Sequence, residues 1–482
     1  MRAHARTRTR TRTRVTRTAV TAAALALTGT GLTYVAHGAP PTPAAADTAH
    51  VWITTPDGSS KLADAGTTPF TGSPQSTDIT IDPSATGQRF TGAGASVTEA
   101  SAHLIQQLPA GTRDSLLASL FSRDGDGIGL NYLRQPLGSS DFNADGPFTT
   151  YEDTQGAFSI DRDKQETIPV VKQAQAVNPS IRFMGTPWSA PAWMKTGNDL
   201  KGGKLDPAHY QDYADYLVKA VKAYDAEGIE LTDLTTQNEP ELETSYPSMS
   251  MSSSEQADFL KVLDRTLTAN GLDTNLLAYD HNWDHPDYPL DVFGRTSGMS
   301  RLIGAAFHCY GGTPEAQQQI RDAGKRVFFT ECSGTDSENT ADTFKDTLKW
   351  HAENLVVRNM RSGGETVVDW NLALDPNGGP HQGNCSTRCN GVVEIAGGDV
   401  TLNAEYYTLG HLSKFVDVGA SRIGSTGDGT IQNVAFQNPD GERVLYAVNT
   451  GSSAQPFSVT DDGRSLTYTL PAGAVATFTW QP

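Results

Sequence analysis

Between residues 90 and 412, eight short apolar segments alternate with stretches of helical periodicity. The clearest helix signals are at 209–228, which ends in Gly, and at 252–271, which opens with Ser before Glu and closes on Asn-Gly. Apolar strands that alternate with helices are typical of a parallel sheet covered on both faces, so the pattern restricts the chain to an α/β fold. The eight predicted strands are 90–97, 128–137, 181–189, 231–239, 275–283, 302–310, 326–332 and 366–374.

The number of strands favours a closed barrel. Eight strands close a (β/α)₈ (TIM) barrel, and a span of about 320 residues falls within its usual size. The alternative is an open doubly wound sheet, which would need a glycine-rich phosphate turn after its first strand. The segment GAGAS (92–96) matches such a turn only weakly, because no helix clearly continues it. We therefore predict a barrel over residues 90–411.

Short strands bounded by turn residues occupy both ends of the remaining chain, at 51–62 and 76–83 and again after residue 412. The C-terminal tail alone has too few strands for a sandwich, so we expect the N-terminal strands to join it. The predicted domains are a signal peptide (1–46), the N-terminal strands of a β-sandwich (47–89), the barrel (90–411) and the rest of the sandwich (412–482).

The first 46 residues are typical of a targeting segment. Arg alternates with Thr over 2–17, small apolar residues follow at 19–36, and 44–46 offer an A-x-A-like cleavage site. Thr and Gly interrupt the apolar stretch, which disfavours a permanent membrane helix, and no adjacent Arg pair indicates a twin-arginine route. We expect a secreted, soluble protein without stable membrane insertion.

Charge excludes some partners. Residues 1–46 hold seven Arg, and without them the chain has 30 basic and 55 acidic residues, a net charge of −25. Such a surface repels nucleic acid and anionic membranes and suits a neutral or cationic partner.

Four cysteines are present. Cys385 and Cys389 lie in a polar loop and are expected to form a small loop-closing disulfide; a metal site is the alternative but lacks nearby ligands. Cys309 and Cys332 lie inside predicted apolar strands and are interpreted as buried thiols, although a disulfide is possible if those strands are neighbours.

Two predicted strands end in a glutamate followed by strand-breaking residues: Glu239 in LTDLTTQNEP (231–240) and Glu331 in RVFFTECSG (326–334). A carboxylate at the end of an apolar strand costs free energy to bury unless a partner or a ligand interacts with it there. In a barrel both glutamates would lie at the face where active sites occur. A carboxylate pair is the catalytic equipment of a glycosidase.

Other strand ends carry side chains suited to a sugar, because aromatic rings pack on its C–H faces and polar groups bind its hydroxyls. Trp188 and Trp370 could instead pack in the core, and Arg134 could pair an acid at the rim. Asp280 and His281 are interpreted as groups that bind a loop. The candidate binding residues are Arg134, Asp141, Trp188, Asn238, His308, Tyr310 and Trp370.

Seven motifs resemble glycoside hydrolase family 30, in that family's order over most of residues 50–482. They are LRQPLGSSDF (133–142), GTPWSAPAWMKT (185–196), QNEPE (237–241), FHCYGG (307–312), TEC (330–332), DWNLALDPNGGP (369–380) and YYTLGHLSKFV (406–416). The resemblance implies a retaining mechanism without cofactor or metal, with Glu239 as acid/base and Glu331 as nucleophile. On this basis the pKa of Glu239 should be raised, whereas Arg134 should favour the ionised form of Glu331.

The resemblance further implies that Asn238 binds the sugar 2-OH and that Asp141, Trp188 and Trp370 bind glucose, while His308 and Tyr310 line the site. The motifs are closer to the glucosylceramidase and β-1,6-glucanase branch than to the xylanases. The predicted function is a monomeric endo-β-1,6-glucanase acting on β-glucan. The alternatives are a glucosylceramidase or exo-β-glucosidase, a non-catalytic sugar-binding protein on the same scaffold, and a tail that binds sugar independently.

Overall fold

The computed structural model describes residues 47–482 except 73–77, 384, 386 and 428. The predicted signal peptide therefore lies outside the described residues. Among the residues that are described, no helix is long and apolar enough to cross a membrane.

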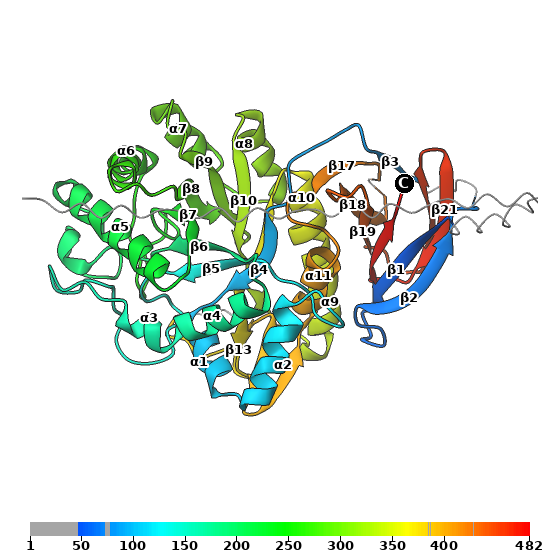
Figure 1. Cartoon of the computed structure of the whole chain (residues 1–482), viewed down its shortest axis with the longest axis horizontal. Coiled ribbons are helices and arrows are strands. Elements are labelled where there is room, and N and C mark those ends of the chain that lie inside the picture. The colour runs from blue at the N-terminus through cyan, green and yellow to red at the C-terminus, as the bar shows by residue number, and fades with distance from the viewer. Residues whose placement is uncertain (1–46, 73–77, 384, 386, 428) are drawn as a thin grey trace, which may run out of the picture. The chain divides into compact units, whose positions relative to one another are not determined.

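All eight predicted strands form one parallel sheet (Figure 1). Its order along the sheet is β10-β9-β8-β7-β6-β5-β4-β12. The end strands β10 and β12 also meet, because the N–H of Glu365 donates to the carbonyl of Val327 at 2.9 Å and that of Trp370 to Cys332 at 2.8 Å. The sheet thus closes into the predicted barrel. The strands are β4 (Gly92–Ser96), β5 (Tyr132–Pro136), β6 (Arg182–Thr186), β7 (Leu231–Thr235), β8 (Asn275–Asn282), β9 (Leu302–His308), β10 (Arg326–Glu331) and β12 (Thr366–Asn371).

The glycines of β4 serve packing rather than phosphate binding. A Cβ atom at Gly94 would overlap the carbonyl oxygen of Tyr132 on the neighbouring strand β5. Glycine here allows the two backbones to approach closely, which explains the GAGAS segment without a nucleotide site.

Helices surround the barrel, and the two with the clearest sequence signals are confirmed. Helix α5 (Tyr210–Ala226) follows β6, and α6 (Ser253–Ala269) follows β7. Ser252 and Glu255 form a complete capping box at the start of α6, as the Ser-before-Glu pattern predicts. The other α-helices are α1 (Glu99–Gln107), α2 (Ala110–Phe121), α3 (Asp161–Gln165), α4 (Thr167–Val177), α7 (Asp287–Arg295), α8 (Gln318–Asp322), α9 (Thr343–His351), α10 (Asn359–Arg361) and α11 (Ala404–Ser413).

The two ends of the described chain build one β-sandwich. The N-terminal strand β1 (Thr48–Thr54) pairs with the C-terminal strand β22 (Val475–Trp480), and β3 (Asp78–Asp82) lies between β17 and β20, so that blue and red strands are neighbours in Figure 1. The remaining strands of the sandwich are β2 (Ala63–Pro69), β17 (Ser421–Ser425), β18 (Ile431–Gln437), β19 (Arg443–Asn449), β20 (Gln455–Asp461) and β21 (Arg464–Leu470).

Barrel and sandwich share a core. Outward-facing residues of β18, β19 and β22, among them Phe436, belong to the same buried cluster as Phe90 and α11. Helix α11 runs past the predicted boundary at residue 411. Its His411 is buried, with one ring nitrogen 2.9 Å from the Thr54 hydroxyl and the other 3.0 Å from that of Thr477. Burial lowers the pKa of His411 to about 3, so this link is made by a neutral imidazole.

Candidate active site

Irregular strand ends create the carboxyl-end face of the barrel. The parallel pairing slips by one residue between Phe329 and Glu331 in β10, and between Asp369 and Asn371 in β12. A similar slip occurs in β8 next to Asp280. Such bulges break the alternation of side chains and are frequent at barrel rims and beside active sites. They allow the side chains of consecutive residues to point toward this face.

The backbone is strained at the same face. Glu239, Tyr279 and Asp280 have φ angles of 45°, 74° and 66°, in the left-handed region that non-glycine residues rarely adopt. Each such residue costs on the order of 1–3 kcal/mol and persists only when its surroundings hold it. Here the N–H of Glu239 donates to the carbonyl of Asp280 at 3.0 Å. The strain is concentrated where the glutamate side chain must be aimed.

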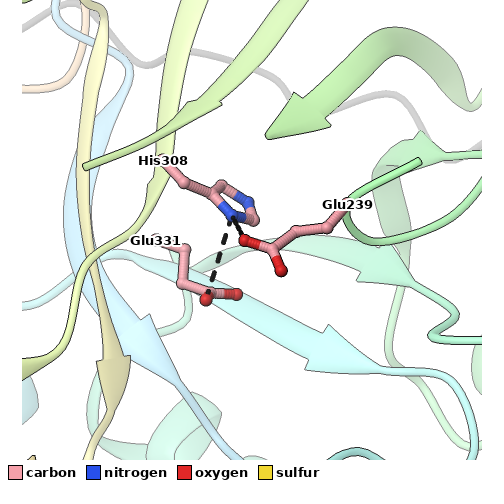
Figure 2. Close-up of side chains that lie close together, drawn as sticks. All are labelled: Glu239, His308 and Glu331. Atoms are coloured by element: carbon pink, nitrogen blue, oxygen red, sulfur yellow. Dashed lines mark hydrogen bonds and ion pairs between the residues drawn. The ribbon is translucent and has the colours of Figure 1, made fainter. Parts of the chain in front are cut away.

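Glu239, Glu331 and His308 meet in one buried cluster (Figure 2). One oxygen of each carboxylate and one nitrogen of His308 all lie within 4.8 Å of one another. His308 Nδ1 is 3.0 Å from Glu239 and 3.9 Å from Glu331, and its Nε2 is 3.0 Å from Asp280. The two glutamates predicted to form a pair are thus side by side.

Arg134 lies fully buried beneath the carboxylates. Its guanidinium donates to Glu331 at 2.5 Å, to the Asn238 side chain at 2.8 Å and to Asp280 at 2.9 Å. It also lies 5.0 Å from the ring centre of Trp188 and 5.5 Å from that of Trp370. Although burial alone would lower it, the pKa of Arg134 is raised by Asp280 and Glu331. This arginine therefore supplies a permanent positive charge to the site.

A pocket of about 380 Å³ opens above these groups. The indole rings of Trp188 and Trp370 stack at 4.9 Å in its wall. Arg134 and His308 lie beneath the pocket. Seven of the nine predicted residues line it: Asp141, Trp188, Asn238, Glu239, Tyr310, Glu331 and Trp370.

Two family models match the chain over these domains. The glycosyl hydrolase family 30 TIM-barrel domain matches residues 90–416, and the family 30 beta sandwich domain matches 419–478. The chain belongs to glycosyl hydrolase family 30. It is therefore a glycoside hydrolase.

Relatives of this family 30 chain cover most of its length. It is 31% identical over 438 residues to the endo-1,6-beta-D-glucanase BGN16.3 of Trichoderma harzianum, covering 84% of this chain and 87% of that protein. It is 26% identical to the lysosomal acid glucosylceramidase of Mus musculus, covering 84% and 83%. The solved endo-beta1,6-glucanase BT3312 is 32% identical, with a TM-score of 0.82 over 90% of this chain and all of that one.

Charges inside this family 30 site set the protonation of the carboxyls. Burial raises the pKa of Glu331, and the nearby Glu239 and Asp280 add to it against His308 and Arg134. Burial also raises the pKa of Glu239, but His308, His281 and Arg134 outweigh it and lower that pKa. The expectation that Glu239 has the raised pKa and Glu331 the lowered one is therefore wrong for the free protein. The reason is that the sequence did not place His308 between the two carboxyls.

His308 and Asp141 have displaced pKa values as well. Burial would lower the pKa of His308, but Glu331, Asp280 and Glu239 raise it to about 9. Burial and the charge of Glu331 raise the pKa of Asp141 to about 8. At neutral pH His308 is an imidazolium and Asp141 is protonated.

Asp280 was wrongly set aside as a loop-binding group. Its carboxylate is fully buried and accepts from Arg134, His308 and the hydroxyls of Thr235 (3.0 Å) and Thr330 (2.8 Å). His281, also set aside, lines the pocket 3.8 Å from Glu239. Their position at the end of the 275–283 strand, the barrel face where active sites lie, was the sequence signal that could have placed them in the site.

Tyr246 is a further pocket residue that the sequence did not indicate. It lies in the loop after Glu239, where no periodic pattern fixes the direction of a side chain.

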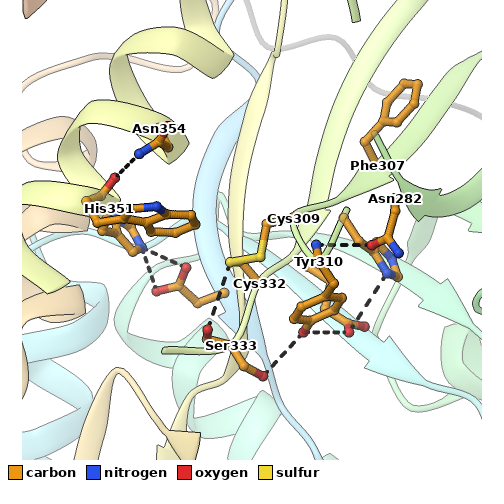
Figure 3. The surroundings of a disulfide bond; sticks show 12 residues. Asn282, Phe307, Cys309, Tyr310, Cys332, Ser333, His351 and Asn354 are labelled. Carbon is orange, nitrogen blue, oxygen red and sulfur yellow. Dashed lines mark hydrogen bonds and ion pairs between the residues drawn. A yellow bond between two sulfur atoms is a disulfide. The ribbon is translucent and has the colours of Figure 1, made fainter. Parts of the chain in front are cut away.

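Both cysteine pairs are joined. Cys385–Cys389 forms the predicted loop disulfide, and both residues line the pocket. Cys309 and Cys332 are also joined, although they were interpreted as thiols. The reason is that β9 and β10 are neighbours, so the residues after their ends meet beside Tyr310 (Figure 3).

Protonation of His308 opposes the binding of a metal ion at the carboxylate cluster. Within the described residues, Glu239, His308 and Glu331 are the group of His, Cys, Asp or Glu side chains close enough to share one. Both nitrogens of His308 face carboxylates, and its raised pKa keeps a proton on each of them. A protonated imidazole has no lone pair to offer a metal.

Proposed function

We propose that this family 30 hydrolase is a secreted, retaining endo-β-1,6-glucanase. The single observation that supports the mechanism is the close approach of Glu239 and Glu331, with one oxygen of each within 4.8 Å, at the floor of a pocket lined by stacked indoles. Retaining glycosidases hold their carboxyls roughly 5–5.5 Å apart, whereas inverting ones leave room for a water molecule between them.

In the first step Glu331 attacks the anomeric carbon and the bond to the leaving oxygen breaks. Glu239 gives that oxygen a proton, so the leaving sugar departs as an alcohol and Glu331 becomes a glycosyl ester. In the second step Glu239 takes a proton from water, the water oxygen attacks the anomeric carbon, and Glu331 leaves as a carboxylate. Arg134, which donates to Glu331 at 2.5 Å, stabilises that carboxylate.

His308 supplies a place for the catalytic proton. Its Nδ1 lies 3.0 Å from Glu239, so a proton that resides on the imidazole in the free protein can move along this hydrogen bond to the carboxylate. Formation of the glycosyl ester removes the charge of Glu331, which is a main cause of the raised pKa of His308. The pair therefore gives up its proton more readily as the ester forms in the first step, and the proton that Glu239 takes from water in the second step restores the starting state when Glu331 is again a carboxylate.

The sugar at the cleaved bond would bind between the stacked indoles and the polar groups around them. Asn238, held by Arg134 at 2.8 Å, would bind the 2-OH, while Asp141 and Trp370 would address other hydroxyls. A protonated Asp141 can donate to a hydroxyl oxygen as well as accept from one.

The relatives support the choice of substrate. Three fungal endo-1,6-beta-D-glucanases are 30–31% identical to this chain, whereas the glucosylceramidases of Caenorhabditis elegans and Mus musculus are 26–28% identical. A neutral glucan also suits the strongly acidic chain. Glucosylceramidase or exo-β-glucosidase activity is the second candidate, since relatives with the former name cover the chain equally well.

Secretion is supported by two features. The first 46 residues have the pattern of a signal peptide, and two disulfides are typical of an oxidising compartment.

Product analysis tests the substrate. We expect a ladder of β-1,6-linked oligosaccharides from β-1,6-glucan and little product from β-1,3-glucan, xylan or glucosylceramide. NMR of the first product should show the β-anomer, because two inversions restore the configuration. Glucose as the sole product, or an initial α-anomer, would contradict endo action or retention respectively.

Two variants test the roles of the glutamates. Glu239→Gln should lose about 10²–10⁴-fold activity on glucan, but less on an aryl β-glucoside with an acidic leaving group, which needs no proton. Glu331→Gln should lose nearly all turnover on both substrates while it still binds oligosaccharide. A non-catalytic sugar-binding protein would instead behave identically with and without Glu331.

A further inference from the structure

A second hollow, of about 460 Å³, lies beside the active-site pocket. The two share Tyr310, Ser333 and Thr335 as lining residues, so they are direct neighbours. Figure 3 shows the Cys309–Cys332 disulfide of this hollow with Tyr310 and Ser333 nearby. Its other walls come from the loop after β10 and from α9, namely Gly334, Asp336, Ser337, Asp346, Thr347, Trp350 and His351.

Exposed aromatic surface gathers at this hollow. Across the described residues, four large apolar or aromatic side chains are exposed: Tyr310, Trp350, Val177 and Val418. Both of the aromatic ones line the hollow, and Trp350 is 46% exposed. In the described part of the chain the indole of Trp350 stacks on no other ring and its N–H has no partner. Two exposed aromatic side chains in one hollow offer a ligand flat apolar faces on which to stack.

The local structure holds Trp350 and Tyr310 in place. The Trp350 carbonyl accepts from the Asn354 side chain at 2.9 Å, and α9 continues directly into a π-helical segment, η5 (Ala352–Arg358). π-Helical segments are rare in proteins, and those that occur are often found at functional sites. On the other side, the Tyr310 hydroxyl donates to Glu331 at 3.0 Å and lies 3.3 Å from that of Ser333. One aromatic wall is thus tied to the predicted nucleophile and the other to a rigid helix.

The remaining groups suit a neutral polyhydroxyl ligand. Asp346 accepts from the Ser337 hydroxyl at 2.8 Å, and Asp336 accepts from Arg388 at 2.8 Å. Each carboxylate has further lone pairs that can accept from sugar hydroxyls. Two carboxylates at the wall repel an anionic ligand. An indole face packs on the C–H face of a pyranose, which is the apolar part of a sugar.

We propose that this hollow is a further sugar subsite that binds the next glucosyl unit of a β-glucan, with Trp350 as its stacking platform. The proposal rests on the proposed glucanase function and adds the place where the chain continues beyond the cleaved bond. Trp350 is a substrate-binding residue in this scheme and has no part in the chemistry, because it lines the second hollow whereas Glu331 lines the active-site pocket.

Trp350→Ala tests the subsite. We expect kcat/KM on β-1,6-glucan to fall about tenfold, mainly through KM, while kcat/KM on β-glucosyl fluoride stays unchanged, because that substrate has only a fluorine atom beyond the cleaved bond. Trp350→Phe should restore much of the activity on glucan, since it keeps an aromatic face. Val418→Ala, an exposed apolar residue of the sandwich side, serves as the matched control and should change neither substrate.

The outcomes separate the two proposals. Wild-type cleavage of β-1,6-glucan decides the proposed function, and the ratio between variant and wild type decides the subsite. Unchanged activity of Trp350→Ala on glucan, or an equal loss on both substrates with an unaltered circular dichroism spectrum, would overturn the subsite alone. A wild type that cleaves β-glucosyl fluoride but not β-1,6-glucan would overturn both.

Discussion

At the scale of single residues, Asp280 organises the site although it does not line the pocket. It is fully buried between Arg134 and His308, and its carboxylate faces both cations. These cations and their hydrogen bonds lower the pKa of Asp280 despite its burial. The carboxylate thus holds in place the arginine that donates to Glu331 and the histidine that donates to Glu239.

Asp280→Asn should therefore destabilise the protein by about 3–5 kcal/mol, because two buried positive charges lose their common partner. Urea unfolding measures this change in the free energy of unfolding. Asp284→Asn, an exposed aspartate in the loop after the same strand, is the matched control and should stay within about 0.5 kcal/mol of wild type. Equal stability of the two variants would show that Asp280 is not the organising charge.

Asp141 gives a stability that depends on pH. Its pKa in the folded protein is raised to about 8 from 3.8, so between these values the folded state holds a proton that the unfolded state has lost. Stability contributed by this group is present below pH 3.8 and falls as the pH rises toward 8. Asp141→Asn removes this term. The difference in Tm between the variant and wild type should grow from pH 4 to pH 8; a constant difference would contradict the raised pKa.

At the scale of elements, the Cys309–Cys332 disulfide ties together the loops that leave β9 and β10. Cys332 follows Glu331 directly, and Cys309 lies between His308 and Tyr310. The bond thus joins two segments that carry groups around the predicted nucleophile. Strand pairing alone does not fix these residues, because the regular ladder ends before them.

Replacing both of these cysteines by serine should lower the free energy of unfolding by about 3 kcal/mol, because the bond closes a loop with a sequence separation of 23. The matched control is the Cys385→Ser, Cys389→Ser variant, whose bond spans only 4 positions and should cost about 2 kcal/mol. Guanidinium unfolding compares the two. A smaller effect for the longer loop would indicate that the bond at β9 and β10 is not formed.

At the scale of the whole molecule, barrel and sandwich are one cooperative unit within residues 47–482. The sandwich is built from both ends of the described chain and shares a buried cluster with the barrel. Separating or unfolding either domain would therefore expose apolar surface of the other. This arrangement argues against a tail that binds sugar as an independent module.

A chain truncated after residue 416 should not give a stable barrel, and it should be aggregated or bind a hydrophobic dye. In the full chain, Phe436→Ala should cost about 3–5 kcal/mol, since this ring packs against Phe90 at the start of the barrel. Unfolding followed by calorimetry should remain a single transition. A folded, monomeric barrel from the truncated chain would refute this shared core.

The sequence by itself determined the barrel, its eight strands and the shared sandwich, because apolar periodicity and turn residues are local signals that burial enforces. It also predicted two glutamates and seven further residues that lie together in the structure, because parallel strands must end at one face and the motifs matched one family. The tertiary structure alone decided the Cys309–Cys332 bond, the charge network of Asp280 and His308, and the position of Trp350. These depend on which strand ends are neighbours, on bulges that break alternation, and on buried charges whose pKa values are set by groups distant in the sequence.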